Sequence, residues 1–254
     1  MEPSKEQPLI VIFAKNEQDT IMPIVDQCYS YSSNLLLISD SSDGTDRMAS
    51  QRGVEVLRGS GLGKASSFGL FLRTVRLDKW PKVVLIDSDL EHDPSDLPTL
   101  FRELDDADIV QGNRFGKSSF PLKDSIAAFV FKRLTGVRIP DPRCGYMGLR
   151  TDRRLDFSLP CNHLLPMQLL LNNAGRSVRT VAISYHKATK RNHDNDYREF
   201  VELVKYYAPS WGYSNPKAFI EWALAQMNVT LDAARRAFAE GSSHVEEISP
   251  QIGQ

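Results

Sequence analysis

Short hydrophobic runs alternate with amphipathic stretches through the first half of the chain. Each run is followed by polar residues and then by apolar residues at helical spacing. Runs of this kind are typical of strands covered on both faces, and their alternation with helices predicts a mostly parallel sheet with helices on both faces. The expected strands cover residues 9–13, 35–38, 54–57, 83–86 and 108–111.

The helices expected around these strands follow from a spacing of about 3.6 residues between apolar positions. The first is expected to bury Ile21, Ile24, Val25 and Cys28 on one face. A further strand is expected at residues 178–185. The other expected helices cover residues 46–51, 64–77, 95–104, 123–134, 164–173, 196–207, 217–227 and 231–239. We therefore expect an α/β domain over residues 1–210, a C-terminal helical extension over 211–240 and a flexible tail over 241–254.

Composition adds exclusions. The 254 residues are 41% hydrophobic and 25% charged, which is ordinary for a globular protein. The formal net charge of −1 predicts no sequence-independent affinity for nucleic acid. No apolar run approaches the roughly 20 residues that span a bilayer, and the polar N-terminus does not resemble a secretory signal. Three cysteines are too few for a disulfide scaffold, so we expect a cytoplasmic location.

The densest polar segment follows the fourth expected strand. Residues 87–93 contain four acids: Asp87, Asp89, Glu91 and Asp93. In parallel sheets, ligands bind beyond the carboxyl ends of the strands. Carboxylates this close repel one another, and a cation such as Mg²⁺ or Mn²⁺, held also by a diphosphate, would offset the repulsion. The alternative is a solvated acidic turn that caps the next helix.

Polar groups also follow the first and second strands. Acids and amides at these positions can bind a base or a ribose, although Asp, Ser and Gly also favour turns for local reasons. A glycine-rich segment, residues 58–64, precedes the next helix and offers backbone N–H groups and a lysine to phosphate, although its spacing is not that of a Walker loop. The residues concerned are Ala14, Asn16, Glu17, Asp40, Ser42, Gly63 and Lys64.

Cations follow the later strands. Arg114 comes after the fifth strand, and Lys187, Lys190 and Arg191 form a dense basic cluster after residues 178–185. Such groups bind phosphate through charge-assisted hydrogen bonds. The alternative for the cluster is a solvated charged loop.

Taken in order, these segments resemble the family 2 glycosyltransferases of the GT-A fold. The resemblance extends over residues 8–207 and is closest to the branch of dolichyl-phosphate mannose synthases and polyprenyl-phosphate glycosyltransferases. It depends on the motifs FAKNE (13–17), SDSSDGT (39–45), GLGKASSFGL (61–70), DSDLEHDP (87–94), DIVQGNRF (108–115) and DPRCGYMGLR (141–150). The implied architecture is a GT-A, Rossmann-like α/β sheet.

The resemblance implies a nucleotide-diphosphate-sugar donor, a divalent cation and transfer of a hexose with inversion. Asp87, Asp89, Arg114 and Asp141 are the implied catalytic residues, and Asp89 and Glu91 the implied metal ligands. The implied donor-binding residues are Ala14, Asn16, Glu17, Asp40, Ser42, Gly63, Lys64, Asp87 and Ser88. Phosphate or acceptor binding falls to Arg114, Gln168, Lys187, Lys190 and Arg191.

The class of acceptor is inferred from one position at which this sequence differs from related enzymes. Gln168 falls where related enzymes often carry a carboxylate base, and an amide cannot take a proton. A phosphate monoester is already largely anionic at neutral pH. We therefore expect a polyprenyl or dolichyl phosphate as acceptor, and Asp141 as base if the acceptor is a hydroxyl.

Several alternatives stay open. The aromatic segment 204–227 either docks at a membrane as a peripheral contact or packs on the domain. The same chemistry would serve a soluble or polymeric hydroxyl acceptor: a glycan, a protein or a hydroxymethylated base in DNA. A non-catalytic nucleotide-sugar-binding protein is the alternative from another functional class.

Overall fold

The computed structural model describes residues 7–116, 120–186 and 196–239, and within them one sheet of seven strands. Its strand order is β3-β2-β1-β4-β6-β5-β7. All pairings are parallel except those of β6 with β4 and β5. The strands are β1 (Leu9–Ala14), β2 (Leu35–Ser39), β3 (Glu55–Arg58), β4 (Lys82–Asp87), β5 (Ile109–Asn113), β6 (Met147–Arg150) and β7 (Val178–Ala182).

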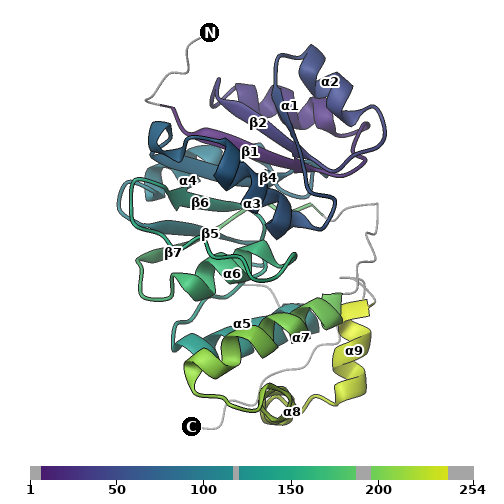
Figure 1. Ribbon diagram of the computed structural model, residues 1–254, viewed down its shortest axis with the longest axis vertical. Coiled ribbons are helices and arrows are strands. Elements are labelled where there is room, and N and C mark those ends of the chain that lie inside the picture. Colours follow the sequence, from purple (N-terminus) through teal and green to yellow (C-terminus); the bar gives the residue numbers. More distant parts are fainter. Residues whose placement is uncertain (1–6, 117–119, 187–195, 240–254) are drawn as a thin grey trace.

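Helices cover both faces of this sheet (Figure 1). They are α1 (Ile21–Tyr29), α2 (Thr45–Gln51), α3 (Lys64–Thr74), α4 (Leu97–Glu103), α5 (Leu122–Thr135), α6 (Leu165–Asn172), α7 (Asp196–Tyr207), α8 (Pro216–Gln226) and α9 (Leu231–Ala239). The mostly parallel α/β sheet expected from the sequence is confirmed, and so is the buried face of α1.

Strand β1 shows why the sheet is covered on both faces. All six of its residues are buried. Successive side chains of a strand point to opposite faces, so Val11 and Phe13 join the apolar cluster under α3, α5 and α6, while Ile10 and Ile12 join the one under α1, α2 and α4. A continuous apolar run is the sequence signature of this arrangement.

Strand β6 was not expected. It lies antiparallel between β4 and β5 and therefore separates two strands that follow one another in the chain. Its four residues include Gly148, where an added Cβ would lie 2.9 Å from Leu104 Cδ1. Leu104, at the end of α4, packs directly against the strand at this position, where there is room only for glycine. A glycine weakens the hydrophobic pattern by which a strand is recognised in a sequence.

Several expected boundaries also differ from the structure. The strand expected at residues 178–185 ends at Ala182, and the helix expected at 64–77 ends at Thr74. The helix expected at 95–104 begins at Leu97, because a 3₁₀ turn at Pro94–Asp96 comes first. Asp93 caps that turn by accepting a hydrogen bond from the Ser95 backbone N–H.

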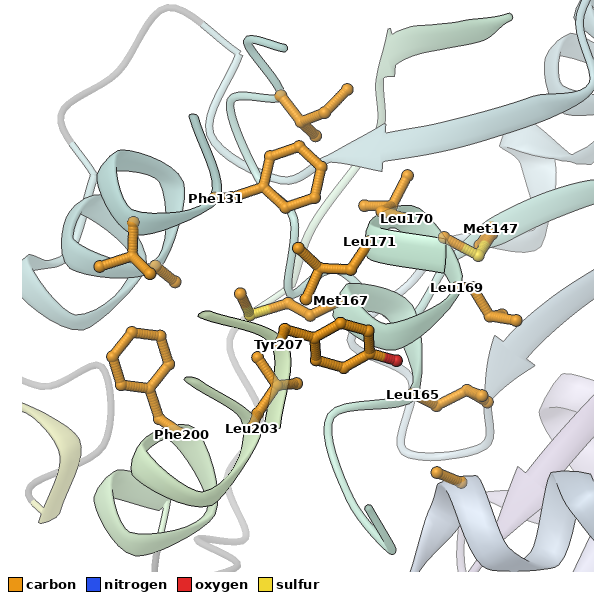
Figure 2. Packing of buried hydrophobic residues seen from close by; sticks show 14 of the residues in the cluster. Phe131, Met147, Leu165, Met167, Leu169, Leu170, Leu171, Phe200, Leu203 and Tyr207 are labelled. Carbon is orange, nitrogen blue, oxygen red and sulfur yellow. The ribbon is translucent and has the colours of Figure 1, made fainter. Parts of the chain in front are cut away.

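The helices after β7 pack together with α5 and α6 (Figure 1). Figure 2 shows Phe200, Leu203 and Tyr207 of α7 beside Met167 and Leu171 of α6. Helices α8 and α9 bury apolar side chains in the same cluster, so the aromatic segment packs on the domain. Tyr206, Trp211 and Trp222 remain 57%, 38% and 37% exposed. Among the described helices, none has the length and apolar character to cross a bilayer.

Candidate functional site

A cleft of about 580 Å³ opens at the carboxyl ends of β1, β2 and β4, beside the start of α3. Seven of the predicted donor-binding residues line it: Ala14, Glu17, Asp40, Gly63, Lys64, Asp87 and Ser88. Asn16 and Ser42 do not. Asn16 Oδ1 instead accepts a hydrogen bond of 2.8 Å from the Ser42 backbone N–H, so this pair joins the loops after β1 and β2.

Asp40 ties the glycine-rich segment to the sheet. One carboxylate oxygen accepts a hydrogen bond of 2.8 Å from the Gly61 N–H, and the other accepts one of 3.0 Å from the Ser67 hydroxyl. An added Cβ at Gly59 would lie 2.2 Å from the same carboxylate, so only glycine allows this approach. Asp40 thus shapes the cleft wall through the loop that it holds.

The start of α3 is closed by another segment of the chain. The carbonyl of Asn162 accepts hydrogen bonds of 2.9 and 3.4 Å from the Ala65 and Ser66 N–H groups. Gly63 has φ of +126°, and a Cβ there would lie 2.6 Å from the Asn162 carbonyl oxygen. The Ala65 and Ser66 N–H groups are therefore not available to a phosphate, whereas the Lys64 side chain lines the cleft at this end of α3.

Asp87 and Lys64 form an ion pair at the end of β4. Burial alone would raise the pKa of Asp87, but Lys64, His92 and Arg114 together hold that pKa below its ordinary value. Asp87 is therefore an anion in the cleft, and Lys64 lies within reach of any phosphate bound beside it.

Asp89 is the next carboxylate along the loop and also lines the cleft. Burial, Asp87 and Glu91 raise its pKa to about 7. One oxygen of Asp89 accepts a hydrogen bond of 3.0 Å from the Glu91 N–H. Glu91 is not among the residues that line the cleft, and its side chain is hydrogen-bonded to that of Tyr185. Of the two predicted metal ligands, the structure brings Asp89 to the cleft.

The donor chemistry at Asp89 suits a hard divalent cation. The described residues contain no group of three or more His, Cys, Asp or Glu side chains arranged to hold a metal. Mg²⁺ is commonly held by one or two carboxylates together with phosphate oxygens, so it needs no such group. Burial, followed by the charges of Asp87 and Glu91, raises the pKa of Asp89, and a bound cation would favour its ionised form.

Arg114 belongs to a buried ion network. Its guanidinium donates two hydrogen bonds of 2.8 Å to the two oxygens of Asp141 and one of 3.1 Å to Asp124. Arg143 donates to the same Asp124 oxygen at 3.0 Å. Asp124 and Asp141 are fully buried. The base role predicted for Asp141 has no support here, because both oxygens are engaged by Arg114. The same network engages Nε and Nη2 of Arg114, and the phosphate and catalytic roles expected of this residue stay predictions.

Gln168 is buried and holds the segment that closes α3. Its amide donates hydrogen bonds to the carbonyls of Cys161 (2.8 Å) and His163 (2.6 Å), and its carbonyl accepts one from the Cys161 N–H. The predicted acceptor contact through Gln168 is therefore not supported. The remaining predicted phosphate ligands, Lys187, Lys190 and Arg191, lie outside the described residues.

Two histidines at this site were missed. His163 lines the cleft, and its Nδ1 lies 3.2 Å from Oε1 of Glu199. His92 is buried below the acidic loop, with Nδ1 4.0 Å from Asp87 Oδ2 and Nε2 3.7 Å from Cys144 Sγ. Neither belongs to a metal or catalytic spacing in the sequence. For His163 no local pattern points to the site, since its partner lies on a distant helix.

The environment of His92 predicts a dependence of stability on pH. Burial lowers the pKa of His92 from 6.5 to about 3, although Asp87 opposes this. The unfolded chain binds this proton below pH 6.5 and the folded chain does not, so stability falls as the pH drops from about 6.5 to 3. His92 is expected to contribute at most about 1.4 kcal/mol per pH unit to the slope of the free energy of unfolding against pH.

Replacing His92 with phenylalanine keeps a ring against Tyr146 and Tyr185 and removes the titrating group. Urea unfolding of the wild type and H92F between pH 4 and 7 measures the difference. The expected result is a shallower dependence in H92F, and identical slopes in the two proteins would contradict the assignment.

The geometry can be compared with known proteins. A sequence model of glycosyl transferase family 2 matches residues 9–153, which is more than half of the chain. The chain belongs to this family. The matched residues contain the cleft-lining loops after β1, β2 and β4, so the family's nucleotide-sugar transfer applies to this glycosyltransferase. Members of the family often use divalent cations.

Relatives of this family 2 glycosyltransferase are distant. An uncharacterized protein of Methanocaldococcus jannaschii is 24% identical over 204 residues, an alignment that covers 70% of this chain and 88% of the relative. Because this relative is uncharacterized, the similarity does not indicate a substrate. The dolichyl-phosphate mannose synthase branch is not identified by these comparisons, whereas the family expected from the sequence is confirmed.

Two solved structures share the fold. A mycobacterial protein superposes with a TM-score of 0.62 at 19% identity, covering 80% of this chain and 75% of its own. Glucosyl-3-phosphoglycerate synthase from Mycobacterium tuberculosis, in complex with phosphoglyceric acid, superposes with a TM-score of 0.61 at 19% identity, covering 88% and 81%. The GT-A fold expected from the sequence is thereby confirmed.

Proposed function

We propose that this glycosyltransferase moves a hexose from a nucleotide-diphosphate sugar to an acceptor with inversion at the anomeric carbon. The observation that carries the proposal is the cleft in which Lys64 and Asp87 form an ion pair beside Asp89. We assign the catalytic unit to residues 1–210 and treat 211–240 as a helical extension of it.

The proposed mechanism is an in-line displacement. The acceptor oxygen bonds to the anomeric carbon while the bond from that carbon to the diphosphate breaks. Lys64 stabilises the charge that develops on the departing diphosphate. Asp89, with Glu91 nearby, would hold Mg²⁺ or Mn²⁺, which when bound supplies further charge to the leaving group. Glu17 and the loop held by Asp40 enclose the nucleoside end of the donor.

Two classes of acceptor remain candidates. A polyprenyl or dolichyl phosphate needs no base, and the exposed rings of Tyr206, Trp211 and Trp222 favour a peripheral membrane contact on the cytoplasmic side. A hydroxyl acceptor needs a base, and a second cavity beside His163 favours this class. The similar synthase was solved with phosphoglyceric acid, which carries a hydroxyl, and this gives the second class further support.

A donor screen tests the proposal. GDP-, UDP- and dTDP-sugars are added with Mn²⁺, with Mg²⁺ or with EDTA, and melting temperature and nucleotide release are measured. One donor is expected to raise the melting temperature, because a ligand at 100 times its Kd stabilises the folded state by about 2.7 kcal/mol. Release of its nucleotide is expected to depend on the cation.

The same screen separates the alternatives. Binding of a donor without its consumption, with every acceptor, would indicate a non-catalytic nucleotide-sugar-binding protein. Transfer is then assayed on polyprenyl phosphate, on small hydroxyl compounds, on glycans and proteins, and on DNA with hydroxymethylated bases. No binding of any nucleotide sugar would contradict the proposed function.

A further inference from the structure

A second cavity, of about 690 Å³, opens beside the donor cleft between residues 160–163 and helix α7. Glu199, Glu202 and Lys205 of α7 line one side, and Cys161 and His163 line the other. His163 also lines the donor cleft, so one side chain faces both cavities. An acceptor held in the second cavity would meet the donor at His163.

The imidazole of His163 is fixed on two sides. An added Cβ at Gly63 would lie 2.6 Å from Cε1 of His163, so the ring packs directly on the glycine at the start of α3. On the other side Nδ1 lies 3.2 Å from the Glu199 carboxylate. A carboxylate at this nitrogen favours the tautomer that carries its proton on Nδ1, which leaves the lone pair on Nε2. No described residue hydrogen-bonds with Nε2, and 38% of the side chain is exposed.

Asp89 is the proposed ligand of the cation, and three other carboxylates near the cleft are engaged by neighbouring groups. Both oxygens of Asp141 accept from Arg114, and both oxygens of Asp40 hold the glycine-rich segment. Asp87 is paired with Lys64. Gln168, at the position where related enzymes often carry a carboxylate, is an amide that donates a hydrogen bond to the His163 carbonyl. His163 is therefore the group at the junction of the cavities that is both oriented and able to accept a proton.

We propose that His163 is the general base of this enzyme, that Glu199 positions it, and that the acceptor is a hydroxyl compound bound in the second cavity. The proposal rests on the proposed function. As the acceptor oxygen bonds to the anomeric carbon, its proton passes to Nε2 of His163. The electrons of the breaking bond go to the nucleotide diphosphate. The imidazolium formed is stabilised by the Glu199 carboxylate and returns its proton to solvent.

The experiment compares two nucleophiles in wild type and variants. Water needs a base to attack the donor, whereas azide is already an anion. His163→Ala is expected to lower nucleotide release with water by about 10² to 10⁴-fold. Donor affinity, measured by calorimetry, is expected to stay within about twofold of the wild type, since His163 acts on the acceptor. Azide is expected to restore release, with a glycosyl azide detected by mass spectrometry.

Further variants separate a chemical role from a structural one. His163→Phe keeps a ring on Gly63 without a proton acceptor and is expected to behave as H163A. Glu199→Gln keeps the side-chain shape, loses the charge and is expected to show a smaller loss. Glu221→Gln makes the same change at an exposed position of α8, where the Glu221 carboxylate lies 3.9 Å from Lys217 Nζ, and is expected to release nucleotide as the wild type does.

The outcomes are distinguishable. A wild type that consumes no donor overturns the proposed function and the base with it. A wild type that consumes donor while H163A and H163F remain as fast overturns the base alone. Slow variants that bind donor weakly and are not restored by azide show a purely structural His163, and this also overturns the base.

Discussion

Replacing Arg114 with methionine is expected to lower the free energy of unfolding by about 3–5 kcal/mol. The substitution leaves the fully buried Asp141 without the guanidinium that binds both of its oxygens, and it removes one of the two arginines at Asp124. A buried carboxylate without its partner either stays charged in an apolar setting or takes up a proton, and both carry a large free-energy penalty. Urea unfolding at neutral pH measures the change.

Two controls define that effect. Adding Asp141→Asn to the Arg114→Met variant removes the unpaired charge and is expected to recover much of the lost stability. Arg52 pairs with Asp26 at 2.6 Å, but both side chains are about half exposed. Arg52→Met is therefore expected to leave stability nearly unchanged. Equal losses in R114M and R52M would contradict the network's role.

Replacing Asp89 with asparagine is expected to reduce glycosyl transfer by at least about 10²-fold, because it removes the charge proposed to hold a cation at the leaving diphosphate. The cation dependence of donor binding, measured by calorimetry with Mn²⁺ and with EDTA, is expected to disappear. Asp78→Asn, an equivalent change at an exposed ion pair with Arg76, serves as control. Unchanged cation-dependent affinity in D89N would contradict the assignment.

Stability is expected to change in the opposite direction. The folded chain raises the pKa of Asp89 to about 7, so it binds a proton that the unfolded chain has released. Stability from this group is therefore lost as the pH rises from about 4 to 7. D89N lacks this loss and is expected to be more stable than the wild type at pH 8 in EDTA. A variant that gains stability while losing transfer marks a residue retained for function.

The strands that form the cleft were predictable because each is a continuous apolar run. In β1 and β4 the polar residues begin where the run ends, so Glu17, Asp87 and Asp89 could be assigned to the same edge of the sheet. Strand β6 could not be predicted in this way, because Gly148 interrupts its short pattern to admit Leu104.

The partners of polar residues were much less predictable than their positions. Arg114 and Asp141 were both expected at the site, and the sequence does not indicate that they bind each other. Gln168 was correctly identified as a residue unable to accept a proton, but its contacts with Cys161 and His163 arise from folding of the loop before α6. His163 gains its significance from Glu199 on α7, a pairing without a local pattern.

The segment before α6 has one more consequence, for the coupling between the binding of the two substrates. The Asn162 carbonyl holds the first turn of α3 beside the proposed donor cleft, and the next residue, His163, lines the second cavity. If the binding of one substrate moves the backbone of Asn162 and His163, it changes the surface to which the other substrate binds. Linkage then requires the two affinities to change by the same factor, so a donor that tightens acceptor binding is itself bound more tightly when the acceptor is present.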